Sequence, residues 1–181
     1  PTLVDGIIEK ALNFDGIDDY VDVNNLNVNT SAGAETTVCF YMYWKGTLLR
    51  MPFGWIAYDL WLLTECFGFN TGNGDCYGIP NDNLQNKWLF ICAIFTNGNI
   101  YNNRLYINGE KQKLSQIIGT PSSTNAYVTP SVRIAGWRWN TAYPFNGTID
   151  EVLIYNKALS EDIIQNLFYR MHLIIYNPSS K

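Results

Sequence analysis

Two tryptophans, Trp137 and Trp139, are spaced to act together on one ligand. They are separated by one residue and surrounded by polar side chains. In an extended segment, alternate residues point the same way, ~6.5–7 Å apart. Indole faces stack on the C–H surfaces of sugars, while amide and guanidinium groups bind hydroxyls. The pattern predicts a neutral glycan site made of Trp137, Arg138, Trp139, Asn140 and Tyr143, with Trp55, Trp61 and Asn73 as further members.

The second interpretation of such tryptophans is that they fill or cover a hydrophobic core. This interpretation fits Trp44 and Trp88 better, because both lie in apolar runs. Trp137 and Trp139 alternate with glycine, arginine and asparagine instead. Both interpretations therefore stay open for this pair.

Carboxylates form another set of candidate side chains. Asp15, Asp18 and Asp19 fall within one turn, and Asp150 lies inside an apolar run. A carboxylate among core residues is costly unless it is hydrogen-bonded, paired or bound to a cation. Hard cations such as Ca²⁺ take several oxygen ligands. A cation site is one explanation of these residues, and an acidic turn beside a hydrogen-bonded core aspartate is the other.

The element that should position these groups is the run FNGTIDEVLIY, residues 145–155. It has apolar residues on both of its period-2 faces, which is typical of a central strand buried between two layers. Simple alternation places Asp150 on the face of Val152 and Ile154. Residues 36–44 and 88–96 predict two more long core strands.

Shorter strands and turns complete the predicted fold. Asn108-Gly109 is the strongest hairpin signal, and residues 115–129 read as a long polar loop. Ser160 is typical of a helix N-cap, and the apolar spacing after it predicts a short helix to about residue 170. Residues 172–176 predict one extra strand. We therefore expect a single domain over residues 1–181, an all-β antiparallel sandwich with one short C-terminal helix.

Composition narrows the class of partner. Charged residues make up 15% of the 181-residue chain, against the ~25% of ordinary globular proteins. The net charge of −4 argues against nucleic acid or an anionic membrane as a partner. No apolar run reaches the ~18 residues of a membrane span. Because the chain opens at Pro1, we expect a mature or excised fragment of a secreted protein.

The four cysteines divide into two pairs by context. Cys39 and Cys92 lie in apolar strand runs and are expected to be small core residues. Cys66 and Cys76 flank a hairpin turn, and an oxidising compartment favours a local disulfide there. A tight turn at residues 71–74 would not place them directly opposite each other, so the bridge stays open.

Several segments together resemble a known family. FNGTIDEVLIYNKALSEDII (residues 145–164) and ALNFDGIDDYVDV (residues 11–23) resemble the C-terminal and N-terminal signatures of laminin G-like domains, members of the concanavalin A-like jelly-roll superfamily. FGFNTGNGDCYGI and LYINGEKQ lie between them in the family's order. The resemblance covers residues 5–168. It implies a two-sheet jelly roll with a structural Ca²⁺ held by Asp15, Asp18 and Asp150.

Catalysis is not expected. Glycanases with this fold carry acids alternating on one strand, as E-x-D-x-x-E, and this chain has no such run. Asp150 and Glu151 are adjacent and so point to opposite faces, which is wrong for a retaining pair. The single histidine, His172, and the absence of a glycine-rich phosphate loop argue against other enzyme classes.

The sequence therefore predicts a non-catalytic, extracellular, lectin-like module that binds a neutral glycan and does not insert into membranes. The alternative is a structural or adhesive surface protein that binds neighbouring domains or copies of itself through the 172–176 segment. Asn29 and Asn146 begin glycosylation acceptor patterns.

Overall fold

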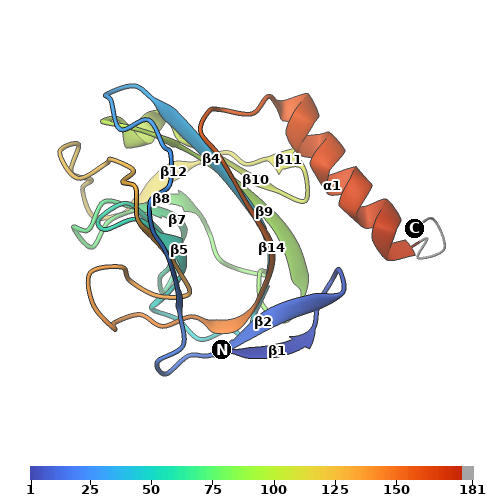
Figure 1. The fold of residues 1–181 in the computed structure, drawn as a ribbon. Helices are drawn as coiled ribbons and strands as arrows, with labels where there is room; N and C mark the ends of the chain where they lie inside the picture. Colours follow the sequence, from blue (N-terminus) through green and yellow to red (C-terminus); the bar gives the residue numbers. More distant parts are fainter. Residues whose placement is uncertain (177–181) are drawn as a thin grey trace.

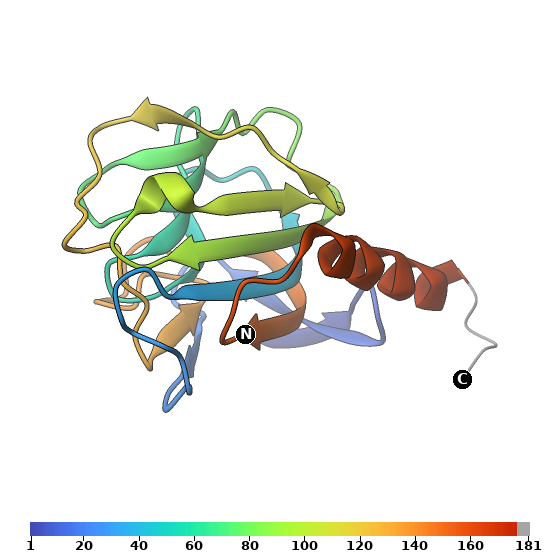
Figure 2. The same cartoon turned by 90° about the horizontal axis from the view of Figure 1, so that it is seen from above.

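Two antiparallel sheets of seven strands each make up most of the described chain, with one helix outside them (Figures 1 and 2). The structure is a computed structural model that describes the backbone of residues 1–176 and the side chains of residues 1–170. The two-sheet jelly-roll prediction is confirmed. None of the described helices is long and apolar enough to span a membrane.

The first sheet has the order β1-β2-β14-β4-β9-β10-β11. Its strands are β1 (Thr2–Asp5), β2 (Lys10–Asp15), β14 (Asn146–Tyr155), β4 (Glu35–Trp44), β9 (Trp88–Thr96), β10 (Arg104–Ile107) and β11 (Glu110–Lys111). A short 3₁₀ turn, η1 (Ile100–Asn102), precedes β10.

The second sheet has the order β12-β8-β7-β6-β5-β13-β3. Its strands are β12 (Ser115–Ile118), β8 (Cys76–Ile79), β7 (Phe67–Asn70), β6 (Asp59–Leu62), β5 (Arg50–Gly54), β13 (Val132–Ile134) and β3 (Val21–Val23).

The core between the sheets is largely aromatic. Phe40 of the first sheet lies 6.0 Å from Phe53 of the second, measured between ring centroids. Phe95 makes edge-to-face contacts with Trp55, Tyr58 and Phe69 at 5.0–6.1 Å. Such pairs are favourable beyond the area that they bury. The long apolar runs of the sequence therefore form strands that each bury one face in this core.

Strand β14 lies near the middle of the first sheet, between β2 and β4, as predicted. A bulge interrupts its pairing with β4 after Asp150, and Glu151 there has φ of 49°. The extra residue shifts the alternation, so Asp150 faces the outer side with its partner Tyr41, while Val152 packs in the core. The expectation that Asp150 shares the face of Val152 and Ile154 was wrong for this reason.

Helix α1 (Glu161–Tyr176) covers the outer face of the first sheet (Figure 1). Ile164 is fully buried there, and Phe168 stacks on Phe90 at 5.9 Å. The helix begins at the predicted N-cap but continues through residues 172–176, so the predicted extra strand was wrong. Because the segment is helical, it does not support the hypothesis that it adds as a strand to a neighbouring copy.

Two further expectations need correction, and one strand was not expected. Cys39 and Cys92 face each other across β4 and β9 and form a disulfide, and so are not free core thiols. The predicted loop at residues 115–129 contains strand β12, which pairs with β8. The chain also begins with β1, an edge strand that the sequence pattern did not indicate.

Candidate functional site

An aromatic pocket lies on the outer face of the second sheet, away from helix α1. Its volume is about 110 Å³. No charged side chain of residues 1–170 lines it. The lining residues are Met51, Trp61, Asn70, Gly72, Gly74, Trp137 and Tyr143.

Strand alternation explains how the sheet supplies the pocket. In β6, Leu60 and Leu62 enter the core between the sheets, which turns Trp61 to the outer face. A break in the pairing between β5 and β6 brings Met51 to the same face as Trp61. Asn70 ends β7 and lies opposite Asp59 of β6. The floor of the pocket therefore comes from three adjacent strands.

The wall of the pocket comes from the loop between β13 and β14. The Tyr143 ring contacts Trp61 at 5.1 Å and Trp137 at 5.9 Å. Trp137 Nε1 donates to the Ile56 carbonyl at 2.9 Å, which fixes its indole. Tyr143 has φ of 57°, a left-handed conformation that is unfavourable for a bulky residue. Such strain is typical of functional positions held by their surroundings.

Arg133, on β13, anchors this loop from below. Its side chain is 7% exposed and donates to the Trp137 and Asn140 carbonyls at 3.0 and 2.7 Å. It also makes a bidentate pair with Asp22 at 2.7 and 3.0 Å and lies over the Tyr20 ring. The guanidinium lowers the pKa of the Asp22 carboxyl. One buried cation therefore ties the aromatic wall to β3.

Asp59 and Asn70 form a polar pair at the base of the pocket. Asn70 Nδ2 donates to Asp59 Oδ2 at 3.3 Å, and both residues are buried. Burial raises the pKa of Asp59 well above its usual range, more than the Asn70 hydrogen bond lowers it, and nearby Asp75 raises it further. A side chain at position 54 would collide with the Asp59 carboxyl, which explains Gly54.

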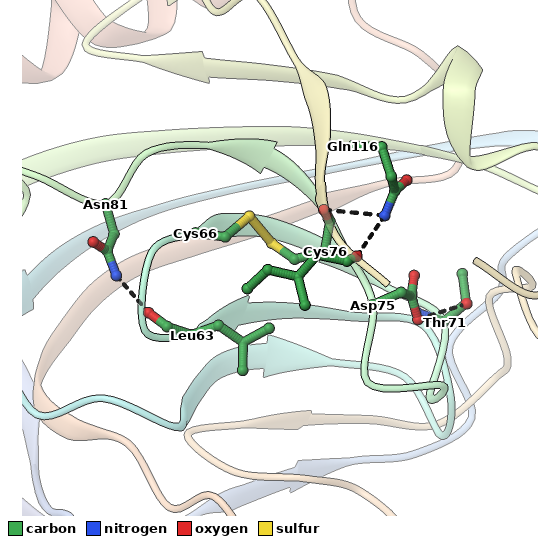
Figure 3. Close-up of a disulfide and its surroundings, with 8 residues drawn as sticks. Leu63, Cys66, Thr71, Asp75, Cys76, Asn81 and Gln116 are labelled. Atoms are coloured by element: carbon green, nitrogen blue, oxygen red, sulfur yellow. Dashed lines mark hydrogen bonds between the residues drawn. A yellow bond between two sulfur atoms is a disulfide. The ribbon is translucent and has the colours of Figure 1, made fainter. Parts of the chain in front are cut away.

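The β7–β8 hairpin forms the rim, with Gly72 and Gly74 in the turn between its strands. Figure 3 shows the disulfide and the Asp75–Thr71 hydrogen bonds of this hairpin. Asp75 is fully buried and accepts from the Thr71 amide and hydroxyl at 3.0 and 2.9 Å. Cys66 and Cys76 form a disulfide with Cα atoms 6.4 Å apart, which settles the bridge that the sequence left open. The rim is therefore held by a covalent bond and a buried carboxylate.

The structure brings together three of the predicted ligand residues: Trp61, Trp137 and Tyr143. Residues 138 and 139 lie in a turn, so Trp137 and Trp139 do not share a face. Trp139 is 71% exposed and lies outside the pocket. Trp55 is fully buried in the core between the sheets, so its assignment to the ligand site was wrong.

The predicted polar members have other roles. Arg138 donates to the Asn24 side chain at 3.2 Å, and Asn140 Oδ1 accepts from the Ala142 amide at 2.7 Å. Asn73 Nδ2 donates to the Thr120 carbonyl at 2.9 Å. Sequence reasoning missed Met51, Asn70, Gly72 and Gly74. The alternation of β6 and the Thr-Gly-Asn-Gly-Asp turn were the signals that could have indicated this face.

The acidic turn and Asp150 occupy different places. Carboxylate oxygens of Asp15, Asp18 and Asp19 lie within 4.8 Å of one another. Asp150 is not in this group. On β14, Asn146 faces Asp15, and Asp150 lies four residues further along, roughly 13 Å at the rise of a strand. Asp150 instead accepts from the Ile7 and Ile8 amides at 2.9 and 3.1 Å, so the predicted ligand set that joined it to the turn was wrong.

Solved structures with the same fold include two kinds of binding domain. The receptor binding domain of botulinum neurotoxin C/D mosaic serotype matches with a TM-score of 0.62 and 16% identity, covering 94% of this chain and 45% of that chain. The serotype D ligand binding domain in complex with N-acetylneuraminic acid has a TM-score of 0.56 and 17% identity, covering 93% and 44%. This chain therefore spans less than half of those domains.

Domain 4 of AbnA, a GH43 extracellular arabinanase from Geobacillus stearothermophilus, was solved in complex with arabinotriose. It matches with a TM-score of 0.57 and 19% identity, covering 91% of this chain and 79% of that chain. No curated protein sequence matches the chain. At these identities the structural likeness shows the fold alone.

The sequence itself gives the family. Residues 15–165, most of the chain and every strand from β3 to β14, match the laminin G family model of the concanavalin A-like lectin/glucanases superfamily. The match begins at the acidic turn and ends in helix α1. The chain therefore belongs to the concanavalin A-like lectin/glucanases superfamily.

Proposed function

We propose that this domain is a non-catalytic carbohydrate-binding module that takes a neutral sugar in the aromatic pocket. The observation that carries the proposal is the pocket itself: Trp61, Trp137 and Tyr143 surround a cavity that no charged side chain of the described residues lines. Concave sites with aromatic walls and a few polar groups are typical of ligand binding. Two structural neighbours bind arabinotriose and N-acetylneuraminic acid, which supports a glycan as the ligand class.

The acids near the pocket do not favour hydrolysis. Asp59 is fully buried, and burial raises its pKa well above the usual range. Asp75 is also fully buried and is used by the hairpin. A glycosidase needs two carboxyl groups that both reach the scissile bond. A binding role fits this arrangement better than a catalytic one.

An extracellular setting is part of the same proposal. All four cysteines are paired in disulfides, which form and persist in oxidising compartments. A secreted sugar-binding module meets its ligand in such a compartment.

The test is a glycan array followed by titration of the best neutral glycan. Trp137→Ala and Tyr143→Gly should each weaken binding at least tenfold, because exposed aromatic anchors dominate such contacts. Tyr143→Gly is informative because glycine accepts the left-handed conformation that strains the tyrosine. Trp139→Ala is the matched control and should bind as the parent does. A loss confined to Trp139→Ala would move the site to the turn, and an array without any neutral ligand would overturn the proposal.

We also propose that the acidic turn holds a structural Ca²⁺. Asp15, Asp18 and Asp19 offer carboxylate oxygens close together, and this donor set suits a hard cation. Three of these oxygens already have partners: Asp15 Oδ1 accepts from the Ile17 amide, Asp19 Oδ2 accepts from the Asp15 amide, and Asp19 Oδ1 pairs with the amino group of Pro1. The Asp18 carboxylate, the second Asp15 oxygen and backbone carbonyls would therefore bind the ion. The ion would tie the β2–β3 turn together without any catalytic part.

Chelation tests this ion. At a hundredfold excess over Kd, a bound ion stabilises by about 2.7 kcal/mol, so EDTA should lower Tm by about 5–10 °C. Asp18→Asn should abolish that response, while Asp150→Asn should keep it, because Asp150 lies apart from the turn. Identical melting curves with Ca²⁺ and with EDTA would exclude the site.

A further inference from the structure

The chain contains four Asn-Gly pairs, and the structure places them in different surroundings. They are Asn73-Gly74, Asn97-Gly98, Asn108-Gly109 and Asn146-Gly147. Asparagine is a thermolabile residue. Its side-chain carbonyl can be attacked by the next backbone amide, and a glycine at that position has no side chain to hinder the attack. A pair reacts in a folded protein only where the asparagine side chain and the following amide are both able to move.

Two of the pairs are held inside the fold. Asn97 is 2% exposed, and the Gly98 amide that would attack it donates to the Ala126 carbonyl at 2.7 Å. Gly147 is buried within β14 and is paired with β2 on one side and with β4 on the other. Either amide would have to leave its place in a loop or in the sheet before it could react.

The third pair closes the β10–β11 hairpin. Asn108 Oδ1 accepts from the Phe90 amide at 2.9 Å, which fixes the asparagine side chain. Gly109 is buried, and Gln165 and Phe168 of helix α1 lie against it. Ring closure here would break the bond to β9 and disturb the contact with the helix, so the folded protein opposes it.

The pair at Asn73-Gly74 differs in both respects. It lies in the turn between β7 and β8, and both residues are exposed. Gly74 has φ of 67°, its amide donates no hydrogen bond to a described residue, and a Cβ added to it would meet nothing within 4 Å. The Asn73 side chain makes a single bond, from Nδ2 to the Thr120 carbonyl at 2.9 Å. The attacking amide is therefore unpaired and has open space around it.

We infer that Asn73 is the site at which the folded protein deamidates spontaneously, with water as the co-reactant. The Gly74 nitrogen loses its proton and forms a bond to Asn73 Cγ, the Cγ–Nδ2 bond breaks, and the amide nitrogen leaves as ammonia. Water then opens the cyclic imide at either of its two carbonyls. The product is aspartate, or isoaspartate where the backbone runs through the former side chain. The net reaction consumes one water and releases one ammonia.

The modification would alter the rim of the aromatic pocket, because the same turn carries Gly72 and Gly74. Asp75 closes this turn by accepting from Thr71 (Figure 3) and from the Asn73 amide at 3.3 Å. Isoaspartate adds one carbon to the backbone between residues 73 and 74, and a turn held at Asp75 takes up that carbon by moving its glycines. Resting on the proposed function, we expect the aged protein to bind its neutral glycan at least threefold more weakly.

Peptide mapping tests the assignment, because trypsin leaves each pair in a different fragment: residues 51–87, 88–104, 105–111 and 139–157. The folded protein is kept at pH 8 and 37 °C for several weeks, then reduced, digested and analysed by mass spectrometry that distinguishes aspartate from isoaspartate. Asn73 should react at least tenfold faster than the asparagine of any other pair. The rate should rise with pH, because the attacking amide has to lose a proton.

Two references show whether the fold sets this selectivity. In the chain reduced and unfolded in guanidinium chloride, all four pairs should react at similar rates. Asn73→Gln keeps a side-chain amide but requires a larger ring, so it should abolish the modification and the loss of glycan affinity on ageing. Asn102→Gln is the matched control, because Asn102 is exposed and is not followed by glycine. It should leave the rate at Asn73 unchanged.

The outcomes separate this inference from the proposed function. Equal rates at Asn73 and at another Asn-Gly pair of the folded protein would overturn the assignment, and so would an unmodified Asn73 under conditions where the unfolded chain reacts. If Asn73 reacts but the aged protein binds its glycan as the fresh protein does, the modification site stands and the effect on the rim is wrong. If no neutral glycan binds the fresh protein, the proposed function fails, and the mass analysis still decides the modification.

Discussion

Asp59 shows how one buried residue ties the pocket to the stability of the domain. Its carboxyl is fully buried and its pKa is raised, chiefly by desolvation. A raised pKa means that the folded state keeps a proton that the unfolded state loses above about pH 4. The contribution of Asp59 to stability is therefore full below that pH and falls as pH rises through the range up to its folded pKa.

Asp59→Asn should remove this pH dependence. Asparagine keeps an oxygen that accepts from Asn70 Nδ2 and never ionises. Between the two pKa values the parent loses about 1.4 kcal/mol per pH unit relative to the variant, or about 3–5 °C in Tm. Melting curves from pH 4 to pH 8 check this. A difference in Tm that stays constant across that range would show that Asp59 is ionised in the folded protein.

Asp150 marks the limit of residue-level prediction. Its costly position inside an apolar strand was evident from the sequence, and hydrogen bonding was one of the stated explanations. The bulge at Glu151 was not evident, because a positive φ at a glutamate leaves no pattern in the residue types. The amides of Ile7 and Ile8 come from a loop more than a hundred residues away in the chain. The hydrogen bonds could not be assigned without that tertiary contact.

At the scale of elements, the loop between β13 and β14 depends on Arg133. Arg133→Lys keeps the charge but loses the planar fork that binds Asp22, Trp137 and Asn140 together. We expect about 2–4 kcal/mol lower stability and at least fivefold weaker glycan binding, because the aromatic wall must then be ordered by the ligand. Thermal melts and hydrogen exchange of residues 137–143 are the measurements.

The control for this loop is Arg138→Lys. Arg138 lies in the same loop but makes a single hydrogen bond with the exposed Asn24 and a longer contact of 3.6 Å with Asp22. It should change stability by less than about 1 kcal/mol. Equal effects of the two substitutions would mean that the net charge near Asp22, and not the buried fork, holds the loop.

Elements with strong periodicity were predictable, and those set by tertiary contacts were not. β4, β9 and β14 follow from long two-sided apolar runs, and the start of α1 follows from Ser160 and the acids after it. The turn at residues 138–139 was missed because two tryptophans in alternation look like a strand. The helix at residues 172–176 was misassigned because a short apolar run fits either structure. The pocket was predicted only in part. Its aromatic residues could be recognised as candidates by residue type, but the face of the sheet that they share could not be predicted without the tertiary structure.

At the scale of the whole molecule, the helix and the pocket lie on the outer faces of different sheets. Helix α1 covers the first sheet, and the pocket lies on the second. Ile164→Ala should cost about 2–4 kcal/mol, because it empties a fully buried position under the helix, without changing glycan affinity in the folded protein. Ile163→Ala, at a neighbouring position that is 45% exposed, should stay within about 0.5 kcal/mol. Loss of glycan affinity in folded Ile164→Ala would show that the two faces are coupled.

The two disulfides are nested: Cys66 and Cys76 both lie within the stretch that Cys39 and Cys92 close. This nesting determines which fragments stay covalently linked after proteolysis. Exposed Lys45 and Lys87 both fall inside the larger ring. One tryptic cut after either lysine yields two pieces that migrate as one band on a non-reducing gel and separate only with a thiol. Cuts at both lysines free residues 46–87, which contain β5–β8 and with them Trp61 and Asn70, from every covalent link to the rest.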